Sequence, residues 1–322
     1  MTTVDIHQHL WPAPFVAALS RRRAAPWLDG DWLVTREGRF RVDPAGHDPA
    51  RRIAGLDAAG LDLAVLSLQP SLGLEQLPAE QREGLEQAWI DGIREVVDGS
   101  GGRLAALAPG RVLAGFLGTS TGAAAVLADL ADPADSADLA DLAGPAGPAD
   151  LAGPAGRSNS VLAEVDAVGG VLFVHPEAEP APPAAGRPDW WNWLVGYPGQ
   201  MQAAYLAWVS GGRQRRPNLR IVFALLAGGA PFQHERLAHR GVDLRSLLDP
   251  DVYFDTASYG RRSIELCIEA FGVECLLYGS DQPVIDPVPT LTAVRGFGDA
   301  VARFLTEQNP ARLLDPRQPG SS

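Results

Sequence analysis

Short runs of apolar residues recur along the chain, and each is bounded by glycine, proline or a polar residue. Most of these runs are continuously hydrophobic, which is typical of parallel strands covered on both faces. We predict eight strands, at residues 4–9, 63–68, 104–108, 115–118, 171–175, 220–225, 252–255 and 275–279.

The segments between these strands carry apolar residues at spacings of three and four, which predicts helices. The predicted helices are at 49–60, 80–98, 199–211, 233–240 and 262–271. Eight strands that alternate with helices favour one α/β domain over residues 1–322, a (β/α)₈ TIM barrel with surface insertions. A doubly wound open sheet shares the same alternation and remains the alternative.

Two segments do not fit the alternation. Residues 127–157 are a low-complexity stretch of degenerate ADLA and AGPAG repeats, which we expect to be a surface insertion without chemistry. Residues 176–198 form an irregular loop after the fifth strand that contains Trp190, Trp191 and Trp193.

Composition narrows the classes of function. A net charge of −12 argues against nucleic acid as a partner, and no apolar run approaches the ~20 residues that span a bilayer. The start of the chain lacks the pattern of a signal peptide, so we expect a cytoplasmic protein. All 27 basic residues are arginines, which excludes Schiff-base, P-loop and carbamylated lysines. Cys267 and Cys275 are expected to be reduced thiols.

Two histidines lie two positions apart in the first predicted strand, in the run V-D-I-H-Q-H. Because strand side chains alternate between faces, His7 and His9 project to the same side. His175 ends the fifth predicted strand, and Asp281 follows the eighth in the turn G-S-D-Q-P. Barrel closure would bring these strand ends around one mouth, so we expect three imidazoles and one carboxylate to bind one divalent metal ion. Zinc suits this ligand set, with manganese or iron as alternatives.

With these motifs, the chain resembles the amidohydrolase superfamily, in the branch that includes aminocarboxymuconate-semialdehyde decarboxylase and resorcylate-type decarboxylases. Similar segments are RRIAGLDAAGLDLAVLS at 51–67 and RIVFALLAGGAPFQHERL at 220–237. The resemblance implies that His7, His9, His175 and Asp281 are the metal ligands, and that the protein acts on a small molecule and can form a homodimer.

One position departs from the resemblance. Members of the family usually have a histidine at the end of the sixth strand, and the matching position here is Leu225. His47, which precedes the first full helix, is expected to be an exposed loop residue.

Three functions are compatible with these residues. We expect hydrolysis of an amide or lactone through a metal-activated water, with Asp281 as the general base. The first alternative is nonoxidative decarboxylation of an aromatic or conjugated carboxylic acid, with Asp281 delivering a proton to carbon. The second is a barrel that binds metal or ligand but is catalytically impaired by Leu225. The candidate residues for contact with the body of the substrate are Trp11, Trp191 and Leu225. The candidate for binding a substrate carboxylate is Arg51, with Arg52 as a second choice.

Overall fold

The computed structural model describes residues 1–131, 160–179, 186–188, 190–243 and 248–315. Most of the predicted insertion at 127–157 lies outside these residues, and its first five positions end a helix. In the Trp-rich segment, positions 180–185 and 189 also lie outside them.

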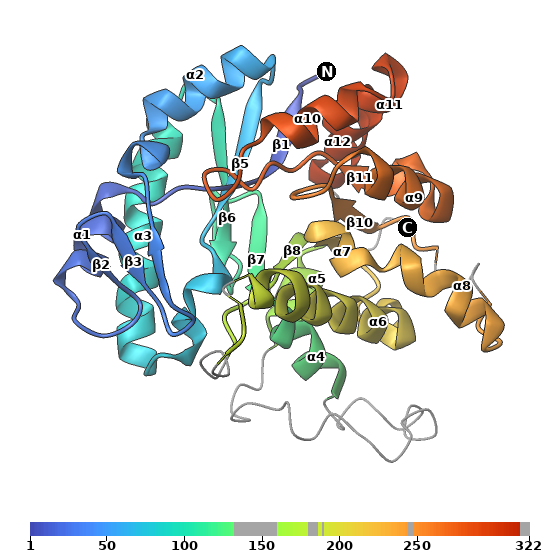
Figure 1. Ribbon diagram of the computed structural model, residues 1–322, viewed down its shortest axis with the longest axis horizontal. Coiled ribbons are helices and arrows are strands. Elements are labelled where there is room, and N and C mark those ends of the chain that lie inside the picture. Colours follow the sequence, from blue (N-terminus) through green and yellow to red (C-terminus); the bar gives the residue numbers. More distant parts are fainter. Residues whose placement is uncertain (132–159, 180–185, 189, 244–247, 316–322) are drawn as a thin grey trace.

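Eight parallel strands form the centre of the molecule, and each pairs with the next strand of the set along the chain (Figure 1). They are β1 Val4–His9, β5 Leu63–Ser67, β6 Leu104–Pro109, β7 Gly118–Gly122, β8 Val171–His175, β9 Arg220–Phe223, β10 Val252–Asp255 and β11 Leu276–Leu277. The first and last strands also meet, because Ile6 N–H donates to Tyr278 O at 2.9 Å and Gln8 bridges Gln282. The fold is therefore a (β/α)₈ TIM barrel, and the open-sheet alternative is wrong.

The fourth strand is the one that the apolar pattern misplaced. The prediction was 115–118, whereas β7 covers Gly118–Gly122 and reads GTSTG. A Cβ on Gly118 would lie 2.6 Å from Val171 O on β8, so the close approach of these strands favours small residues. Hydrophobic runs do not reveal a strand built from glycine and hydroxyl side chains.

The five predicted helices are present, with shifted ends. They are α2 Pro49–Ala59, α3 Ala79–Gly99, α6 Tyr197–Arg215, α8 Pro231–His239 and α9 Arg261–Phe271. Local sequence explains the bounds of α2, since Asp48 Oδ1 accepts from Ala50 N–H at 2.9 Å and Gly60 ends the helix with a left-handed φ of 62°. The remaining described α-helices are α1 Ala13–Arg21, α4 Ala123–Ala131, α5 Val161–Ala167, α7 Leu225–Gly229, α10 Val288–Arg295, α11 Asp299–Arg303 and α12 Asn309–Leu314.

A small antiparallel sheet, which the pattern did not predict, lies between α1 and α2. Its strands are β2 Trp27–Asp29, β3 Trp32–Val34 and β4 Arg39–Arg41. Each has only three residues, too few for an alternating pattern to register. In Figure 1 this sheet lies on the side of the barrel where α1 and α3 pack.

The described helices include none that is both long and apolar enough to cross a membrane.

Candidate metal centre

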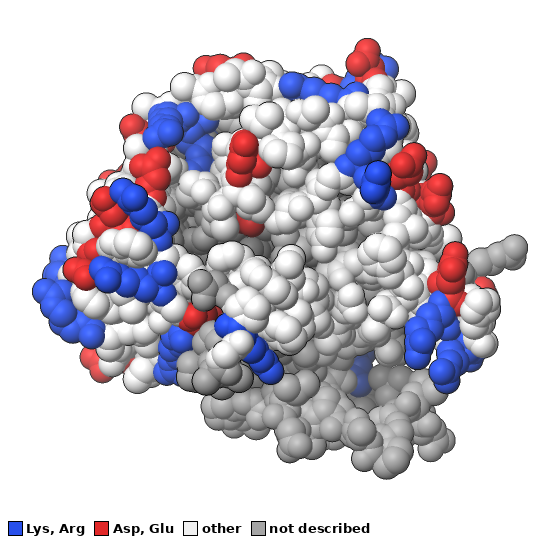
Figure 2. Space-filling model, viewed as in Figure 1, with Lys and Arg blue, Asp and Glu red and all other residues white. Residues whose placement is uncertain are grey.

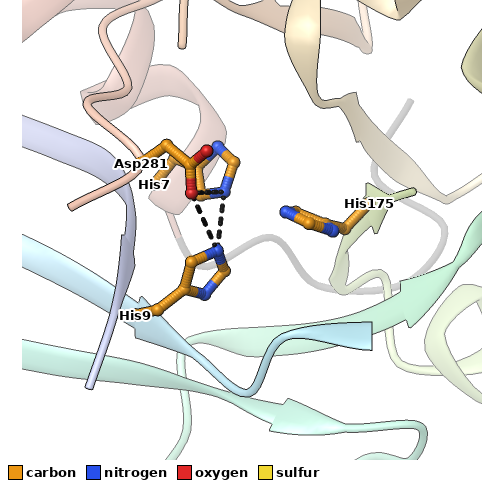
Figure 3. Close-up of side chains that lie close together, drawn as sticks. All are labelled: His7, His9, His175 and Asp281. Atoms are coloured by element: carbon orange, nitrogen blue, oxygen red, sulfur yellow. Dashed lines mark hydrogen bonds and ion pairs between the residues drawn. The ribbon is translucent and has the colours of Figure 1, made fainter. Parts of the chain in front are cut away.

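The four side chains expected to be metal ligands lie together at one end of the barrel (Figure 3). His7 and His9 come from β1, His175 ends β8, and Asp281 follows β11. One nitrogen or oxygen atom from each residue lies within 4.8 Å of those of the other three, and all four residues are buried. The expected convergence is therefore present.

Each imidazole is oriented by a contact of its Nδ1 atom. His7 Nδ1 lies 2.7 Å from Asp255 Oδ2, His9 Nδ1 lies 3.0 Å from Ser67 O, and His175 Nδ1 lies 2.6 Å from Pro176 O. Since the carbonyl and carboxylate oxygens accept hydrogen bonds, Nδ1 carries the proton in each neutral ring. The three Nε2 lone pairs are then free to bind an ion.

The central atoms are close enough to need a proton or a metal ion between them. His7 Nε2 and His9 Nε2 are 3.1 Å apart, and Asp281 Oδ1 is 3.1 Å from His9 Nε2 and 3.5 Å from His7 Nε2. Asp281 Oδ1 is buried and makes no well-oriented hydrogen bond to the described residues. Lone pairs gathered at this distance repel one another unless a proton or metal ion separates them. The donor set therefore fits one divalent ion.

The pKa values describe the same arrangement without an ion. Burial lowers the pKa of His7, but the charges of Asp255 and Asp281 outweigh it and raise that pKa to about 9. Burial lowers the pKa of His9, and lowers that of His175 well below its usual value. Burial opposes ionisation of Asp281, yet His7 and His9 hold its pKa below the usual value. His7 thus keeps a proton near the place where an ion would lie.

Asp255 is a site residue that the sequence analysis missed. It ends β10, and its Oδ1 accepts from Ala257 N–H at 2.8 Å and from Leu225 N–H at 3.2 Å. These contacts fix the carboxylate whose other oxygen faces His7. An acidic residue at the end of a buried strand was the available signal, since Asp281 also follows such a strand.

A cavity of about 940 Å³ opens beside the four ligands. His9, His175, Asp281 and Leu225 contribute to its wall, together with residues of the β2–β4 sheet and of the Trp-rich segment. Figure 2 shows a hollow on this face of the molecule, with the charged side chains mainly around the margin of the face. The cavity is large enough for a drug-sized aromatic molecule.

Glu37 joins two parts of the cavity wall that are distant in sequence. It lies between β3 and β4, and its carboxylate accepts from Tyr197 Oη–H at 2.5 Å, Glu179 N–H at 3.0 Å and Asn192 Nδ2–H at 3.2 Å. The small sheet is thereby attached to the start of α6.

The candidate substrate-binding residues differ in where they lie. Trp11 and Leu225 line the cavity. Arg51 is outside the lining, exposed on α2 with its guanidinium 3.2 Å from Asp43 Oδ2. Trp191 is also outside it and stacks with Trp190 at 6.1 Å between ring centroids.

Arg52, the further choice for a carboxylate, is buried. Its guanidinium donates to Gln8 Oε1 at 2.8 Å and to the carbonyl oxygens of His9 and Gln282, at 3.2 and 3.1 Å. The side chain therefore joins the first and last parts of the barrel.

Leu225 occupies an unusual backbone turn. It begins a run of five residues with left-handed φ, which is 55° at Leu225, 48° at Leu226, 50° at Ala227, 63° at Gly228 and 84° at Gly229. Left-handed φ costs roughly 1 kcal/mol or more for residues with a Cβ. The turn leaves Leu225 against the cavity, so this part of the wall is apolar.

The expectation for His47 is wrong. Only 8% of its surface is exposed, and its ring stacks on Trp11 with centroids 4.3 Å apart. Because His47 also lines the cavity, an imidazole does reach this space from another loop.

Comparison with known proteins gives consistent results. A family model described as amidohydrolase matches residues 4–315. A 2-amino-3-carboxymuconate-6-semialdehyde decarboxylase of Dictyostelium discoideum is 24% identical over 180 residues, which cover 49% of this chain and 49% of the relative. The chain thus matches about half the length of this curated relative.

Solved structures share the fold over nearly all of the chain. The IDCase of Metarhizium anisopliae is 20% identical with a TM-score of 0.71, covering 97% of both chains. The 2,6-dihydroxybenzoate decarboxylase from Rhizobium is 15% identical with a TM-score of 0.66, covering 98% of both. With the family match spanning almost the whole chain, this protein belongs to the amidohydrolase family.

Proposed function

We propose that this protein is a metal-dependent nonoxidative decarboxylase of an aromatic or conjugated carboxylic acid. The observation that carries the proposal is a buried centre of three imidazoles and one carboxylate that opens directly onto a cavity of about 940 Å³. The curated relative and several structures of the same fold are decarboxylases by name, which supports decarboxylation over the hydrolysis expected from the sequence.

The four residues of the centre are the proposed ligands of the metal ion. His7, His9, His175 and Asp281 would hold one divalent ion, zinc or manganese, which when bound supplies positive charge to orient the substrate carboxylate and stabilise negative charge on the substrate. Manganese is present in a 5-carboxyvanillate decarboxylase from Novosphingobium aromaticivorans of the same fold.

Asp281 is the proposed proton carrier. It takes up one proton and delivers it to the carbon from which carbon dioxide departs, so the carbon–carbon bond breaks and a carbon–hydrogen bond replaces it. Leu225 and the aromatic residues of the wall exclude water and contact the flat face of the substrate. Release of uncharged carbon dioxide is favoured by an apolar wall.

The test measures carbon dioxide release. Purified protein is stripped of metal, reloaded with Zn²⁺ or Mn²⁺, and incubated with 2,6-dihydroxybenzoate, 5-carboxyvanillate and muconate-type acids. We expect release of carbon dioxide that depends on the ion. Asp281→Asn should lower the rate by at least about a hundredfold, whereas Asp286→Asn, an exposed residue of the same loop, should not.

Three results would contradict the proposal. Turnover of amides or lactones without carbon dioxide release would show that the protein is a hydrolase instead. Tight metal binding with no turnover of any acid would favour the catalytically impaired barrel. Full activity of Asp281→Asn would exclude this residue as the proton carrier.

A further inference from the structure

Trp11 donates two hydrogen bonds to residues of the cavity wall. Its backbone N–H donates to His47 Nδ1 at 3.1 Å, and its indole Nε1–H donates to Gln69 Oε1 at 2.6 Å. Both acceptors line the cavity beside the metal centre. Trp11 itself is only 4% exposed, and His47 covers one face of its indole. The tryptophan is therefore placed to orient its neighbours more than to stack on a substrate.

The contact with Trp11 fixes where His47 carries its proton. A backbone N–H only donates, so His47 Nδ1 must accept, and the proton of the neutral ring lies on Nε2. Burial, together with the charge of Arg52, lowers the pKa of His47 to about 3, so the ring stays neutral. Nε2 has no hydrogen-bond partner among the described residues, which leaves one donor unused.

The same reasoning orients Gln69. An indole N–H only donates, so the atom that it contacts is the amide oxygen and the other is the NH₂ group. Gln69 follows β5 and is 7% exposed at the cavity. Its two remaining N–H donors have no partner within the described part of the chain. Donors that line a cavity in this way are left to water or to a ligand, and an oxygen atom of the ligand can accept from them.

We propose that His47 and Gln69 form a neutral donor pair which binds an oxygen substituent of the substrate, and that Trp11 is the positioning residue that fixes both. The inference deepens the proposed decarboxylation and rests on it for the substrate class. The acceptor atoms of the pair are engaged by Trp11 and the unused groups are N–H donors, so the pair suits a phenolic, carbonyl, nitro or second carboxylate oxygen. It does not suit an ammonium group or an unsubstituted ring.

The test compares ligands that differ in one oxygen group. Binding of benzoate, of its 2-, 3- and 4-hydroxy derivatives and of isophthalate to the Mn²⁺-loaded protein is measured by calorimetry. We expect at least one oxygen-bearing acid to bind more tightly than benzoate. His47→Phe, which keeps a flat ring against Trp11, and Gln69→Leu should each weaken that acid about tenfold and change benzoate by less than twofold.

Two further variants test the donor geometry. Gln69→Glu keeps an acceptor for the Trp11 indole but replaces the NH₂ donors with an oxygen, so it should weaken the oxygen-bearing acid more than Gln69→Leu. Trp11→Phe keeps the backbone N–H and an aromatic ring against His47, and removes the indole donor with part of the ring. It should reproduce the loss of Gln69→Leu, and the double variant should lose no more, because both changes disable the same group.

The outcomes are distinct from those of the carbon dioxide assay. Equal binding of benzoate and all oxygen-bearing acids by the unmodified protein would overturn the donor pair. The same weakening of benzoate and of the substituted acid in His47→Phe and Gln69→Leu would also overturn it. Discrimination that persists without carbon dioxide release would support the pair and reject decarboxylation.

Discussion

At the scale of single residues, the metal centre depends on groups that never touch the ion. Asp255, Ser67 O and Pro176 O each face an Nδ1 atom and so decide which nitrogen of each histidine is free. Imidazoles held in this way keep their Nε2 lone pairs aimed at one point. Asp255 differs from the other two because it is charged and is itself held by two backbone N–H groups.

Asp255→Asn should weaken metal binding by about ten- to a hundredfold. The amide oxygen can keep the bonds to Leu225 and Ala257, which turns the NH₂ group toward His7 Nδ1. Two N–H donors, the new NH₂ group and His7 Nδ1–H, then face each other without an acceptor. Affinity is measured by competition with a chromogenic chelator. Ser67→Ala is the matched control, because it removes only the Oγ contact at 3.2 Å from His9 Nδ1 while the backbone oxygen still faces that atom. Its metal affinity should change less than threefold. Equal losses in the two variants would reject the special role of Asp255.

Glu86 is a buried acid on α3 whose titration affects stability. Burial raises its pKa to about 7, from an ordinary value of 4.5 in the unfolded chain. Between these two values the folded protein holds a proton that the unfolded chain has lost, so the free energy of unfolding falls as pH rises from 4.5 to 7.

Glu86→Gln should remove this fall. At pH 8 the variant should be more stable than the unmodified protein by roughly 2 kcal/mol, and the difference should vanish near pH 4.5. Urea unfolding at several pH values measures it. Glu95→Gln, an exposed residue nine positions further along the same helix, is the control and should leave this pH dependence unchanged. A gap that is constant with pH would contradict the assignment to Glu86.

At the scale of elements, the segments after the strands shape the cavity. The left-handed turn α7 contacts the start of α6, where a Cβ on Gly228 would lie 2.1 Å from Pro198 O. The small β2–β4 sheet contributes a second wall and is attached to α6 through Glu37. The strands therefore support the four candidate metal ligands, whereas the connecting segments form much of the cavity wall.

Gly228→Ala should destabilise the protein by on the order of 3 kcal/mol, because it adds a left-handed penalty and a clash with backbone. Gly84→Ala is the control, since Gly84 is an exposed helical residue with open space around it, and the change should stabilise by up to about 1 kcal/mol. Thermal unfolding measures both. A Gly228→Ala protein as stable as the unmodified one would show that the contact with Pro198 relaxes easily.

At the scale of the whole molecule, barrel closure makes the site. His7 and Asp281 are 274 positions apart, the difference between 281 and 7, yet Asp281 N–H donates to His7 O at 2.8 Å. Arg52 strengthens the same junction through Gln8 and Gln282 O. Because ligands come from the first, fifth and eighth strands of the barrel, an ion at this site binds only the folded chain.

Removal of metal should therefore lower the thermal stability. An ion present at a hundredfold excess over its Kd contributes about 2.7 kcal/mol, which corresponds to a rise of several degrees in Tm. Scanning calorimetry of chelator-treated protein, with and without added Zn²⁺ or Mn²⁺, measures the shift. An unchanged Tm with both ions would mean that the four ligands do not hold either of them in the folded state.

The strands of the barrel and its four candidate ligands could be predicted because each leaves a local pattern. Apolar runs located seven of the eight strands, and the spacing of His7 and His9 put both on one face. The pattern failed at β7, where buried threonines and serine replace apolar residues, and at the three-residue strands of the small sheet. Asp255 had the right position for a site residue but resembled any acid at the end of a strand.

By itself, the sequence determined the alternation of strands with helices and which side chains can bind a divalent ion, since strand periodicity and ligand chemistry are properties of the residues and their spacing. The tertiary structure decided that the eight strands close into a barrel, because an open sheet shares the same alternation. Only the tertiary structure decided which groups orient the imidazoles, that Leu225 faces the cavity from a left-handed turn, and that His47 is buried against Trp11. Those features depend on contacts between segments far apart along the chain. No local pattern encodes such contacts, because they exist only after the barrel closes.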